Sequence, residues 1–183
     1  MLKKENMKLI KYPDKPSPFC QFFQRNAVTM NISQPAWSLL GTVDITAALE
    51  WLSRGAASWH KTASDTKPQR AFDLPAPAFA GIIESILRFF PDQVIAHSPM
   101  LSRMLTGQSH PMHVDSQRAD WITRVHVPLV TNPTAWIMFE EESTRVHFLT
   151  GIAYSFDIRQ RHAFGNDGPA ERVHFIVDVL RKD

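Results

Sequence analysis

The segment Arg172–Leu180, which reads RVHFIVDVL, carries the clearest structural pattern in the sequence. Alternate side chains of an extended strand point to opposite faces. One face of this segment is wholly apolar, and the other carries charged and polar side chains together with one isoleucine. The polar face holds Arg172, His174, Ile176 and Asp178, and the apolar face holds Val173, Phe175, Val177 and Val179. The pattern predicts a strand whose apolar face packs against helices or against a second sheet.

The segment 122–129, which reads ITRVHVPL, alternates in the same way, with Arg124 and His126 on one face. In a small barrel, such polar faces line the interior, which is a common place for a ligand. In an ordinary antiparallel sheet with one solvated side, the same faces point to water. The sequence leaves both interpretations open.

Residues 93–183 contain many short strand patterns separated by turn residues such as Thr106–Gly107 and Gly165–Pro169. The predicted strands are Gln93–Ser98, Leu101–Leu105, Trp121–Val130, Thr134–Phe139, Arg145–Leu149, Ile152–Asp157, Arg161–Phe164 and Arg172–Leu180. Short strands at near-regular spacing are typical of a sandwich or a jelly-roll barrel.

The two good helical patterns both precede these strands. Asp44–Ser58 begins with a capping residue that strong helix formers follow. Pro77–Phe90 has apolar residues at helical spacing, a proline in its first turn and a second proline, Pro91, just after its end.

Helices followed by strands indicate an α+β, mainly β fold with the helices on one outer face of the sheet. We therefore predict a single domain over residues 1–183. Its helical N-terminal part would comprise residues 1–92, and its jelly-roll core would comprise residues 93–183.

The composition is that of a globular protein with balanced charge. The chain has 183 residues, of which 44% are hydrophobic and 21% charged, and its formal net charge is +2, so disorder is not expected. Basic residues gather only at Lys3, Lys4, Lys8 and Lys11, which we interpret as a solvated end rather than a nucleic-acid-binding patch. The single cysteine, Cys20, excludes an intramolecular disulfide and a cysteine-based zinc cluster. Without a long apolar run or a secretory signal, we expect a cytoplasmic protein that does not bind membranes.

Two histidines and one aspartate form a candidate metal site. His113 and Asp115 are two residues apart, so both project to one side of an extended segment, and His162 lies on a later strand. Two imidazoles and one carboxylate can occupy one face of an octahedral ion and leave three positions open, as in non-haem Fe(II) oxygenases. A His-x-Asp pair alone also arises by chance, and a lone histidine in a strand is more often structural.

Two arginines add anion-binding groups to this half of the chain. A buried guanidinium at Arg172 can bind a carboxylate through two parallel hydrogen bonds. Arg124 and His126 offer a second cation and a second donor on another strand. The set suits a dicarboxylate co-substrate and a substrate that carries its own negative group.

Several motifs in this order resemble the aspartyl/asparaginyl β-hydroxylase family of 2-oxoglutarate- and Fe(II)-dependent oxygenases. The motifs are Gly107-x5-His113-Val-Asp115, Arg124-Val-His126-Val-Pro128, Gly151-x-Ala153-Tyr154, His162-x3-Asn166 and Arg172-x5-Asp178. The resemblance implies a double-stranded β-helix, which is a cupin-like jelly roll. Because some animal members lack the carboxylate ligand, Asp115 places the chain nearer the bacterial branch that hydroxylates amino acids.

The resemblance also implies a role for each matched residue. His113, Asp115 and His162 fall where the family holds its iron, and no catalytic residue beyond this metal centre is expected. Arg172 falls where the family binds the distal carboxylate of 2-oxoglutarate. Arg124 matches an arginine that contacts the substrate carboxylate in some members.

Two further residues match co-substrate contacts of the family, and a third departs from its pattern. His126 matches a histidine near the metal-bound end of 2-oxoglutarate, and Ser102 lies where some members contribute a hydroxyl. Many 2-oxoglutarate enzymes have serine or threonine two residues after the arginine, whereas this chain has His174. His174 either binds the distal carboxylate or is a structural core residue, and the sequence does not separate these roles.

The activity implied by the resemblance is hydroxylation of an amino acid, or of an amino-acid side chain in a peptide or protein. Fe(II) would be the cofactor, and 2-oxoglutarate, dioxygen and a small-molecule or peptide substrate would be the partners. One alternative is a non-catalytic, cupin-type jelly roll that binds a metal or an organic acid, since fold alone does not establish catalysis. Another is a cupin-type isomerase or dioxygenase that does not use 2-oxoglutarate. The sequence makes no prediction of oligomeric state.

Overall fold

The computed structural model describes residues 36–61, 67–90, 94–115 and 119–182. The N-terminal lysines and Cys20 lie outside these residues. In chain order the elements are β1 (Trp37–Thr42), α2 (Thr46–Ser53), β2 (Gln69–Ala71), α3 (Ala76–Leu87), β3 (Val94–Met104), β4 (Ser109–His113), β5 (Trp121–Val130), β6 (Ala135–Phe139), β7 (Arg145–Val146), β8 (Ile152–Phe156), β9 (His162–Asn166) and β10 (Arg172–Arg181).

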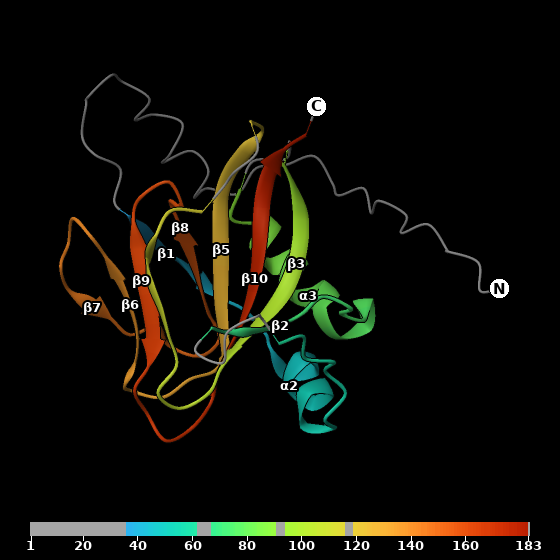
Figure 1. Ribbon diagram of the computed structural model, residues 1–183. Helices are drawn as coiled ribbons and strands as arrows, with labels where there is room; N and C mark the ends of the chain where they lie inside the picture. The colour runs from blue at the N-terminus through green and yellow to red at the C-terminus, as the bar shows by residue number, and fades with distance from the viewer. Residues whose placement is uncertain (1–35, 62–66, 91–93, 116–118, 183) are drawn as a thin grey trace.

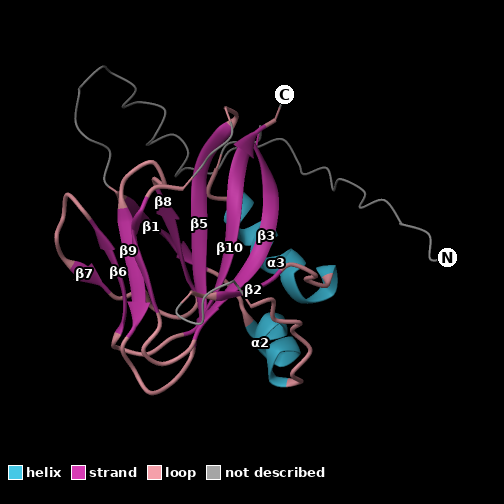
Figure 2. Ribbon diagram, in the orientation of Figure 1, coloured by secondary structure: helices cyan, strands magenta, loops and turns pink. Residues whose placement is uncertain are grey.

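Two antiparallel sheets face each other, and the two helices cover the outer side of the larger sheet (Figures 1 and 2). The larger sheet has six strands in the order β1-β8-β5-β10-β3-β2, and the smaller has four in the order β4-β9-β6-β7. This mainly β arrangement confirms the predicted fold class.

The apolar face of the larger sheet packs against the helices, as the alternation in β5 and β10 predicts. Phe79 of α3 stacks on Phe175 of β10, with ring centroids 5.6 Å apart and planes 14° apart. Both side chains are buried in the larger of two apolar clusters, which also contains Ile82 and Ile86 of α3 and Ala48 of α2. The burial of these side chains supplies the main force that holds the helices on the sheet.

The opposite face of the larger sheet points into the space between the two sheets. A second apolar cluster lies there, in which Phe148 stacks on Tyr154 with ring centroids 4.0 Å apart. The polar residues of β10 share this face, and Arg172 and His174 are only 1% and 2% exposed. Of the two interpretations left open by the sequence, the barrel interior is therefore the correct one.

Both helices are shorter than the sequence pattern predicts. Helix α2 ends at Ser53 rather than Ser58, because Gly55 adopts a left-handed φ of 66° just beyond it. The N-cap of this helix is Ile45 rather than the predicted Asp44, although the Oδ1 of Asp44 accepts a hydrogen bond of 2.9 Å from the backbone N–H of Thr46, the first helical residue. Helix α3 begins at Ala76 and ends at Leu87, three residues before the predicted end.

The strand predictions were accurate at the centre of the larger sheet and wrong at its edges. Trp121–Val130 matches β5, whereas the two strands predicted over Gln93–Leu105 are one strand, β3. The apparent break is an irregularity at Ser98, where φ is 48° and the pairing with β10 shifts register.

Three strands were not predicted. Strands β1 and β2 add edge strands to the larger sheet from the N-terminal part, which is therefore not only helical. Strand β4 is the third, and the predicted strand Arg145–Leu149 is reduced to β7, Arg145–Val146. No helix in the described ranges combines the length and apolar character that a membrane crossing requires.

The helix-to-sheet contact gives a stability prediction. Phe79→Ala should lower the free energy of unfolding by about 3–5 kcal/mol, because it removes a fully buried ring that stacks on Phe175. Chemical denaturation monitored by circular dichroism measures the change. Phe72→Ala is the matched control, since Phe72 is 51% exposed and its loss should cost less than about 0.5 kcal/mol. Equal losses in both variants would contradict this account of the outer layer.

Candidate active site

Strand pairing brings the first candidate metal ligands together. His113 at the end of β4 lies directly opposite His162 at the start of β9 in the antiparallel ladder. Asp115 follows β4 by two residues, and its backbone N–H donates a 3.2 Å hydrogen bond to the carbonyl of Ile158. Two adjacent strands and one anchored loop thus fix three side chains that are far apart in the sequence.

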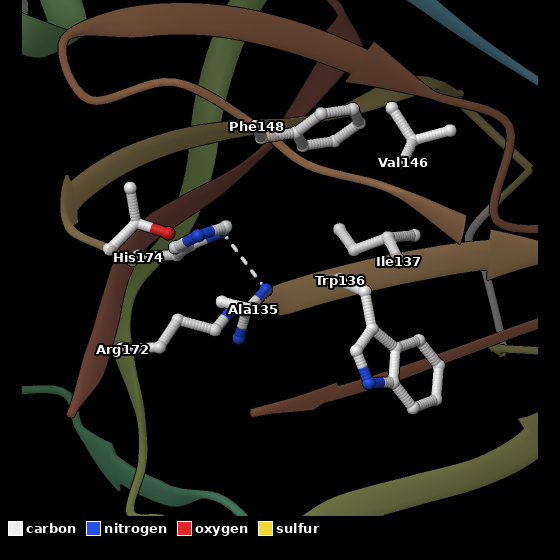
Figure 3. A pocket seen from close by; sticks show the side chains of 8 residues that line it. Ala135, Trp136, Ile137, Val146, Phe148, Arg172 and His174 are labelled. Atoms are coloured by element: carbon white, nitrogen blue, oxygen red, sulfur yellow. Dashed lines mark hydrogen bonds between the residues drawn. The ribbon is translucent and has the colours of Figure 1, made fainter. Parts of the chain in front are cut away.

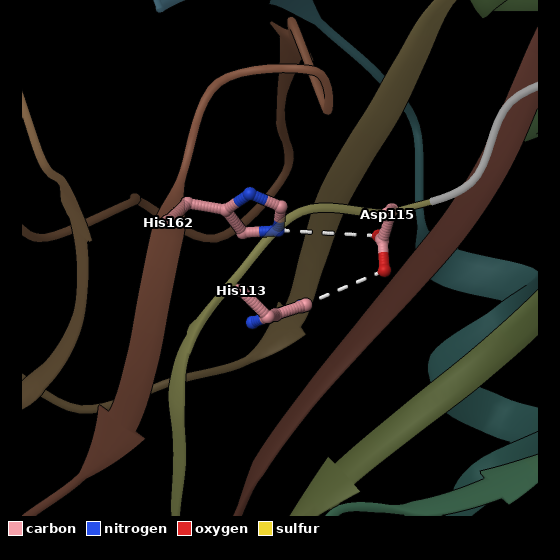
Figure 4. Close-up of side chains that lie close together, drawn as sticks. All are labelled: His113, Asp115 and His162. Atoms are coloured by element: carbon pink, nitrogen blue, oxygen red, sulfur yellow. Dashed lines mark ion pairs between the residues drawn. The ribbon is translucent and has the colours of Figure 1, made fainter.

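The three side chains point toward one another (Figure 4). The Nε2 atoms of His113 and His162 lie 3.5 and 3.9 Å from carboxylate oxygens of Asp115, and one ligand atom from each residue lies within 4.8 Å of the others. Within the described ranges, no other group of three such side chains meets this criterion.

The backbone sets the orientation of both imidazoles. The Nδ1–H of His113 donates to the carbonyl of Pro111 over 2.8 Å, and that of His162 donates to the carbonyl of Gln160 over 2.9 Å. Because Nδ1 carries the proton, each Nε2 presents a lone pair toward the carboxylate of Asp115. Burial lowers the pKa of His162, which keeps this imidazole neutral and able to bind a metal.

This donor set fits a divalent ion with octahedral preference. Neighbouring ligands of such an ion lie about 3 Å apart when each bond is about 2.1 Å long. The observed separations are slightly longer, so a small inward movement of the side chains would complete the coordination. Two nitrogens and one carboxylate leave half of the coordination sphere for other ligands.

Arg124 is held by two carboxylates. Its Nε and Nη2 donate to the two oxygens of Asp178 over 2.8 and 3.0 Å, and its Nη1 donates to Asp115. Arg124 and Asp178 face each other across β5 and β10. Although burial alone would lower it, the pKa of Arg124 is raised by the hydrogen bonds and charge of Asp178 and by the charge of Asp115.

Arg172 and His174 form the polar end of a small pocket between the sheets (Figure 3). The Nη2 of Arg172 lies 2.9 Å from the Nδ1 of His174. The pocket is otherwise lined by Thr131, Ala135, Trp136, Ile137, Val146 and Phe148.

Arg172 has no acidic partner among the described residues, and its Nη1 makes no hydrogen bond there. Burial lowers the pKa of its guanidinium to about 9, so it is still a cation at neutral pH. A buried, unpaired charge is costly, and an anionic ligand in the pocket would compensate it.

His126 lies beside this pocket on β5. Its ring stacks on Phe156 with centroids 4.3 Å apart, and it stands 5.8 Å from the ring of His174. Its Nδ1 is buried and has no partner within the described ranges. Ser102 of β3 is also buried and lies opposite His174 in the ladder. The structure therefore places both predicted co-substrate residues on the face that carries Arg172.

The sequence analysis left two parts of this site without a role. Asp178 was placed on the polar face of its strand, but its ion pair with Arg124 was not foreseen. The alternation pattern could have indicated this ion pair, because Arg124 and Asp178 each lie on the polar face of their strand and the two polar faces are on the same side of the sheet. The apolar pocket wall includes Trp136 of β6 and Phe148 of the loop between β7 and β8, and a strand pattern alone does not identify which side chains meet there.

Several solved structures share this fold. The chain superposes on the viral collagen prolyl hydroxylase of Paramecium bursaria Chlorella virus-1, crystallised with 2-oxoglutarate, with a TM-score of 0.63 and 11% identity, covering 84% of this chain and 100% of that one. A Pseudomonas putida prolyl-4-hydroxylase gives 0.61 and 16% identity, with 81% and 94% covered. HygX of Streptomyces hygroscopicus, with nickel, 2-oxoglutarate and hygromycin B bound, gives 0.59 and 10%, with 80% and 83% covered.

The fold is thus the double-stranded β-helix of 2-oxoglutarate- and Fe(II)-dependent oxygenases, and the His-x-Asp and distant His of that class are present. The model of the aspartyl/asparaginyl beta-hydroxylase family matches residues 42–182, so the chain belongs to this family. Fe(II) and 2-oxoglutarate are the cofactor and co-substrate typical of the family. No match was found among curated proteins.

Burial of the site histidines predicts an acid-sensitive fold. Burial lowers the pKa of His126 and of His174 well below the usual value, whereas both imidazoles take up a proton near pH 6.5 in the unfolded chain. Acid therefore favours the unfolded state. From about pH 6.5 to about pH 5, the free energy of unfolding should fall by up to ~1.4 kcal/mol per pH unit for each histidine.

Urea unfolding of the metal-free protein over this pH range measures the slope. In His174→Gln, the free energy of unfolding should depend less steeply on pH, because the contribution of one histidine, up to ~1.4 kcal/mol per pH unit, is lost. His60→Gln should leave the slope unchanged, because His60 is exposed. Stability that does not depend on pH in this range would show that these histidines are protonated in the folded protein.

Proposed function

We propose that the chain hydroxylates an amino acid, either free or as a side chain in a peptide, with Fe(II), 2-oxoglutarate and dioxygen. The observation that carries the proposal is the buried guanidinium of Arg172, which has no acidic partner in the described part of the chain and lies in the same barrel interior as a cluster of two imidazoles and one carboxylate. An anion-binding pocket and an open metal site suit an enzyme that binds an organic-acid co-substrate beside a metal.

The metal would be held by His113, Asp115 and His162. When bound, Fe(II) would activate dioxygen, which is the oxidant, and the oxidation of 2-oxoglutarate to succinate and CO2 would supply two of the electrons, so that an unactivated C–H bond could be hydroxylated. The chain itself orients the ligands, since two backbone carbonyls fix the imidazole rings and Arg124 holds the carboxylate of Asp115. The barrel walls exclude water from the reacting groups.

The co-substrate would lie in the pocket, with its distal carboxylate on Arg172. The apolar pocket residues Ile137, Val146 and Phe148 suit the methylene groups of a short dicarboxylate. His126 would contact the co-substrate nearer its metal-bound end, because its buried Nδ1 has no partner in the described ranges and its ring lies 5.8 Å from that of His174, which lines the pocket. Ser102 would add a hydroxyl from the neighbouring strand.

Arg124 would bind the negative group of the substrate. Three of its hydrogen bonds go to Asp178 and Asp115, and a guanidinium has five N–H groups, so two remain for a ligand. Its side chain is 15% exposed, which leaves it accessible from the site. A carboxylate of an amino acid matches both the charge and the planar shape of these donors.

The family description and two similar structures support an amino-acid substrate. The family is described by aspartyl and asparaginyl hydroxylation, and two of the solved structures are prolyl hydroxylases. HygX, in contrast, was crystallised with hygromycin B. The substrate screen therefore has to extend beyond amino acids.

The test is an aerobic screen of free amino acids, peptides and other small metabolites with the Fe(II)-loaded protein, 2-oxoglutarate and ascorbate. We expect succinate release together with a product that carries one added oxygen atom, detected by mass spectrometry. Tight Fe(II) binding without any succinate release would instead favour a binding protein. Turnover only with substrates that contain no amino acid would overturn the proposed substrate class.

Removal of one ligand should weaken metal binding. His162→Ala should bind Mn(II) at least about 10-fold more weakly than the wild type, because metal affinity depends on the full set of ligands. Titration monitored by electron paramagnetic resonance measures free Mn(II). His60→Ala provides the control with the same chemical change outside the cluster. Wild-type affinity in His162→Ala would mean that this histidine is not a ligand.

Arg172→Met should separate stability from ligand binding. The metal-free variant should be as stable as the wild type or more stable, by up to about 4 kcal/mol, because an uncompensated buried charge is removed. Its affinity for 2-oxoglutarate should fall by about 2–5 kcal/mol. Denaturation and calorimetric titration measure the two quantities. Arg54→Met, at the exposed C-cap of α2, should change neither. Unchanged affinity in Arg172→Met would place the carboxylate elsewhere.

A further inference from the structure

We infer that Asp178 is a positioning residue for the metal centre. It holds the guanidinium of Arg124, and Arg124 in turn fixes the carboxylate of Asp115 in the orientation that binds a metal. The inference rests on the proposed function, because it concerns the metal site of that proposal. The proposed function itself gives Asp178 no role, although only Arg124 separates this acidic side chain from a candidate ligand.

The carboxylate of Asp115 needs an outside contact to keep one orientation. The torsion that turns an aspartate carboxylate about its Cβ–Cγ bond has a broad energy minimum, so the side chain does not fix it alone. Each imidazole of the cluster is oriented by a backbone carbonyl. The Oδ2 of Asp115 instead accepts a hydrogen bond from the Nη1 of Arg124, while Oδ1 lies 3.5 Å from the Nε2 of His113. Arg124 is therefore the contact that orients the carboxylate.

Arg124 itself has to be held in place. Its side chain has several rotatable bonds, and its positive charge would repel a metal ion that binds Asp115. Asp178 counters both effects, because its two oxygens accept hydrogen bonds of 2.8 and 3.0 Å from the Nε and Nη2 of Arg124. The bidentate contact fixes the plane of the guanidinium, and the negative charge of Asp178 balances the positive charge of Arg124.

The larger sheet fixes the place of this contact. Asp178 of β10 lies directly opposite Arg124 of β5, and the neighbouring pair Val177 with Val125 keeps the same register. The two side chains are only 17% and 15% exposed, so water and salt screen their charges less than at the surface. An ion pair that served only to join β5 and β10 would involve these two strands alone. Here the third contact of Arg124 reaches Asp115, which follows β4 of the other sheet.

Three variants separate positioning from charge. Arg124→Lys keeps the positive charge, but an ammonium group does not reproduce the bidentate contact of a planar guanidinium. Asp178→Asn keeps the shape of the side chain, removes its charge and places an amide N–H group against the donors of Arg124. The third variant combines both changes. Arg145→Lys is the matched control, because Arg145 forms an exposed ion pair with Asp167.

The experiment is titration of the metal-free protein with Mn(II), monitored by electron paramagnetic resonance, together with urea unfolding of each variant. Arg124→Lys and Asp178→Asn should each bind Mn(II) about 10- to 100-fold more weakly than the wild type, the usual effect of losing a group that orients a metal ligand. The combined variant should bind about as weakly as Arg124→Lys, because Asp178 acts through the arginine. The spectrum of bound Mn(II) at saturation should change in both single variants, because the carboxylate is no longer held in one orientation. Arg145→Lys should match the wild type in affinity and in spectrum.

Three results would overturn the inference. Wild-type affinity in Arg124→Lys, with a loss in Asp178→Asn, would mean that Asp178 acts by its charge alone. Additive losses in the combined variant would mean that the two residues act separately. Lower stability in urea with unchanged Mn(II) affinity and spectrum in both single variants would make the pair purely structural.

The proposed function and this inference fail in different ways. If the wild type does not bind Mn(II), the proposed metal centre is wrong. If the wild type binds Mn(II) and neither single variant differs from it, only the inference about Asp178 is wrong. If one single variant does not fold, the affinity and spectrum of the other still decide between a positioning and a structural role.

Discussion

Strand β10 is buried on both faces, and the rest of the molecule is arranged around that constraint. It lies between β5 and β3, so both of its edges are paired. Its apolar face binds the helices through contacts such as Phe79 with Phe175, and its other face delivers Arg172 and His174 to the barrel interior. A shift of one residue in its register would exchange the two faces, which would bury the charges under the helices. The strand that stabilises the core therefore also positions the pocket.

The barrel interior can hold the guanidinium of Arg172, which lacks an acidic partner in the described ranges, because most of the buried apolar side chains lie on the other side of the larger sheet. The larger apolar cluster is on the far side of the sheet, between β5, β10 and the helices. The pocket contributes three buried atoms without partners in the described ranges, all of them on histidines or arginine. Binding sites commonly keep such groups at some expense of stability. The apolar cluster and the pocket thus lie on opposite sides of β10. This arrangement explains why β10 alternates between apolar side chains and three charged or titratable side chains of the site.

The central strands were predictable from the sequence because alternation there reports burial directly. Trp121–Val130 and the start of β10 at Arg172 were placed correctly, and the resemblance identified the cluster of His113, Asp115 and His162. Edge strands β1, β2 and β4 were missed, because an edge has one partner and less need for a regular pattern. The ion pair of Arg124 with Asp178 and the contact of Arg172 with His174 depend on register and on rotamers, which no local pattern encodes.

Charge balance links the two halves of the site. The site contains two arginines, Arg124 and Arg172, and two aspartates, Asp115 and Asp178, so the formal charges of these four side chains cancel. The buried imidazoles of the site are neutral and add no charge. A divalent metal and a dicarboxylate co-substrate would add opposite charges of equal size, so the loaded interior would stay neutral as well. Since charge in a low-dielectric interior is costly, a substrate that is itself neutral overall would be favoured. A zwitterionic amino acid meets this condition, and its carboxylate can bind the N–H groups of Arg124 that the described contacts leave over, which supports the proposed substrate class.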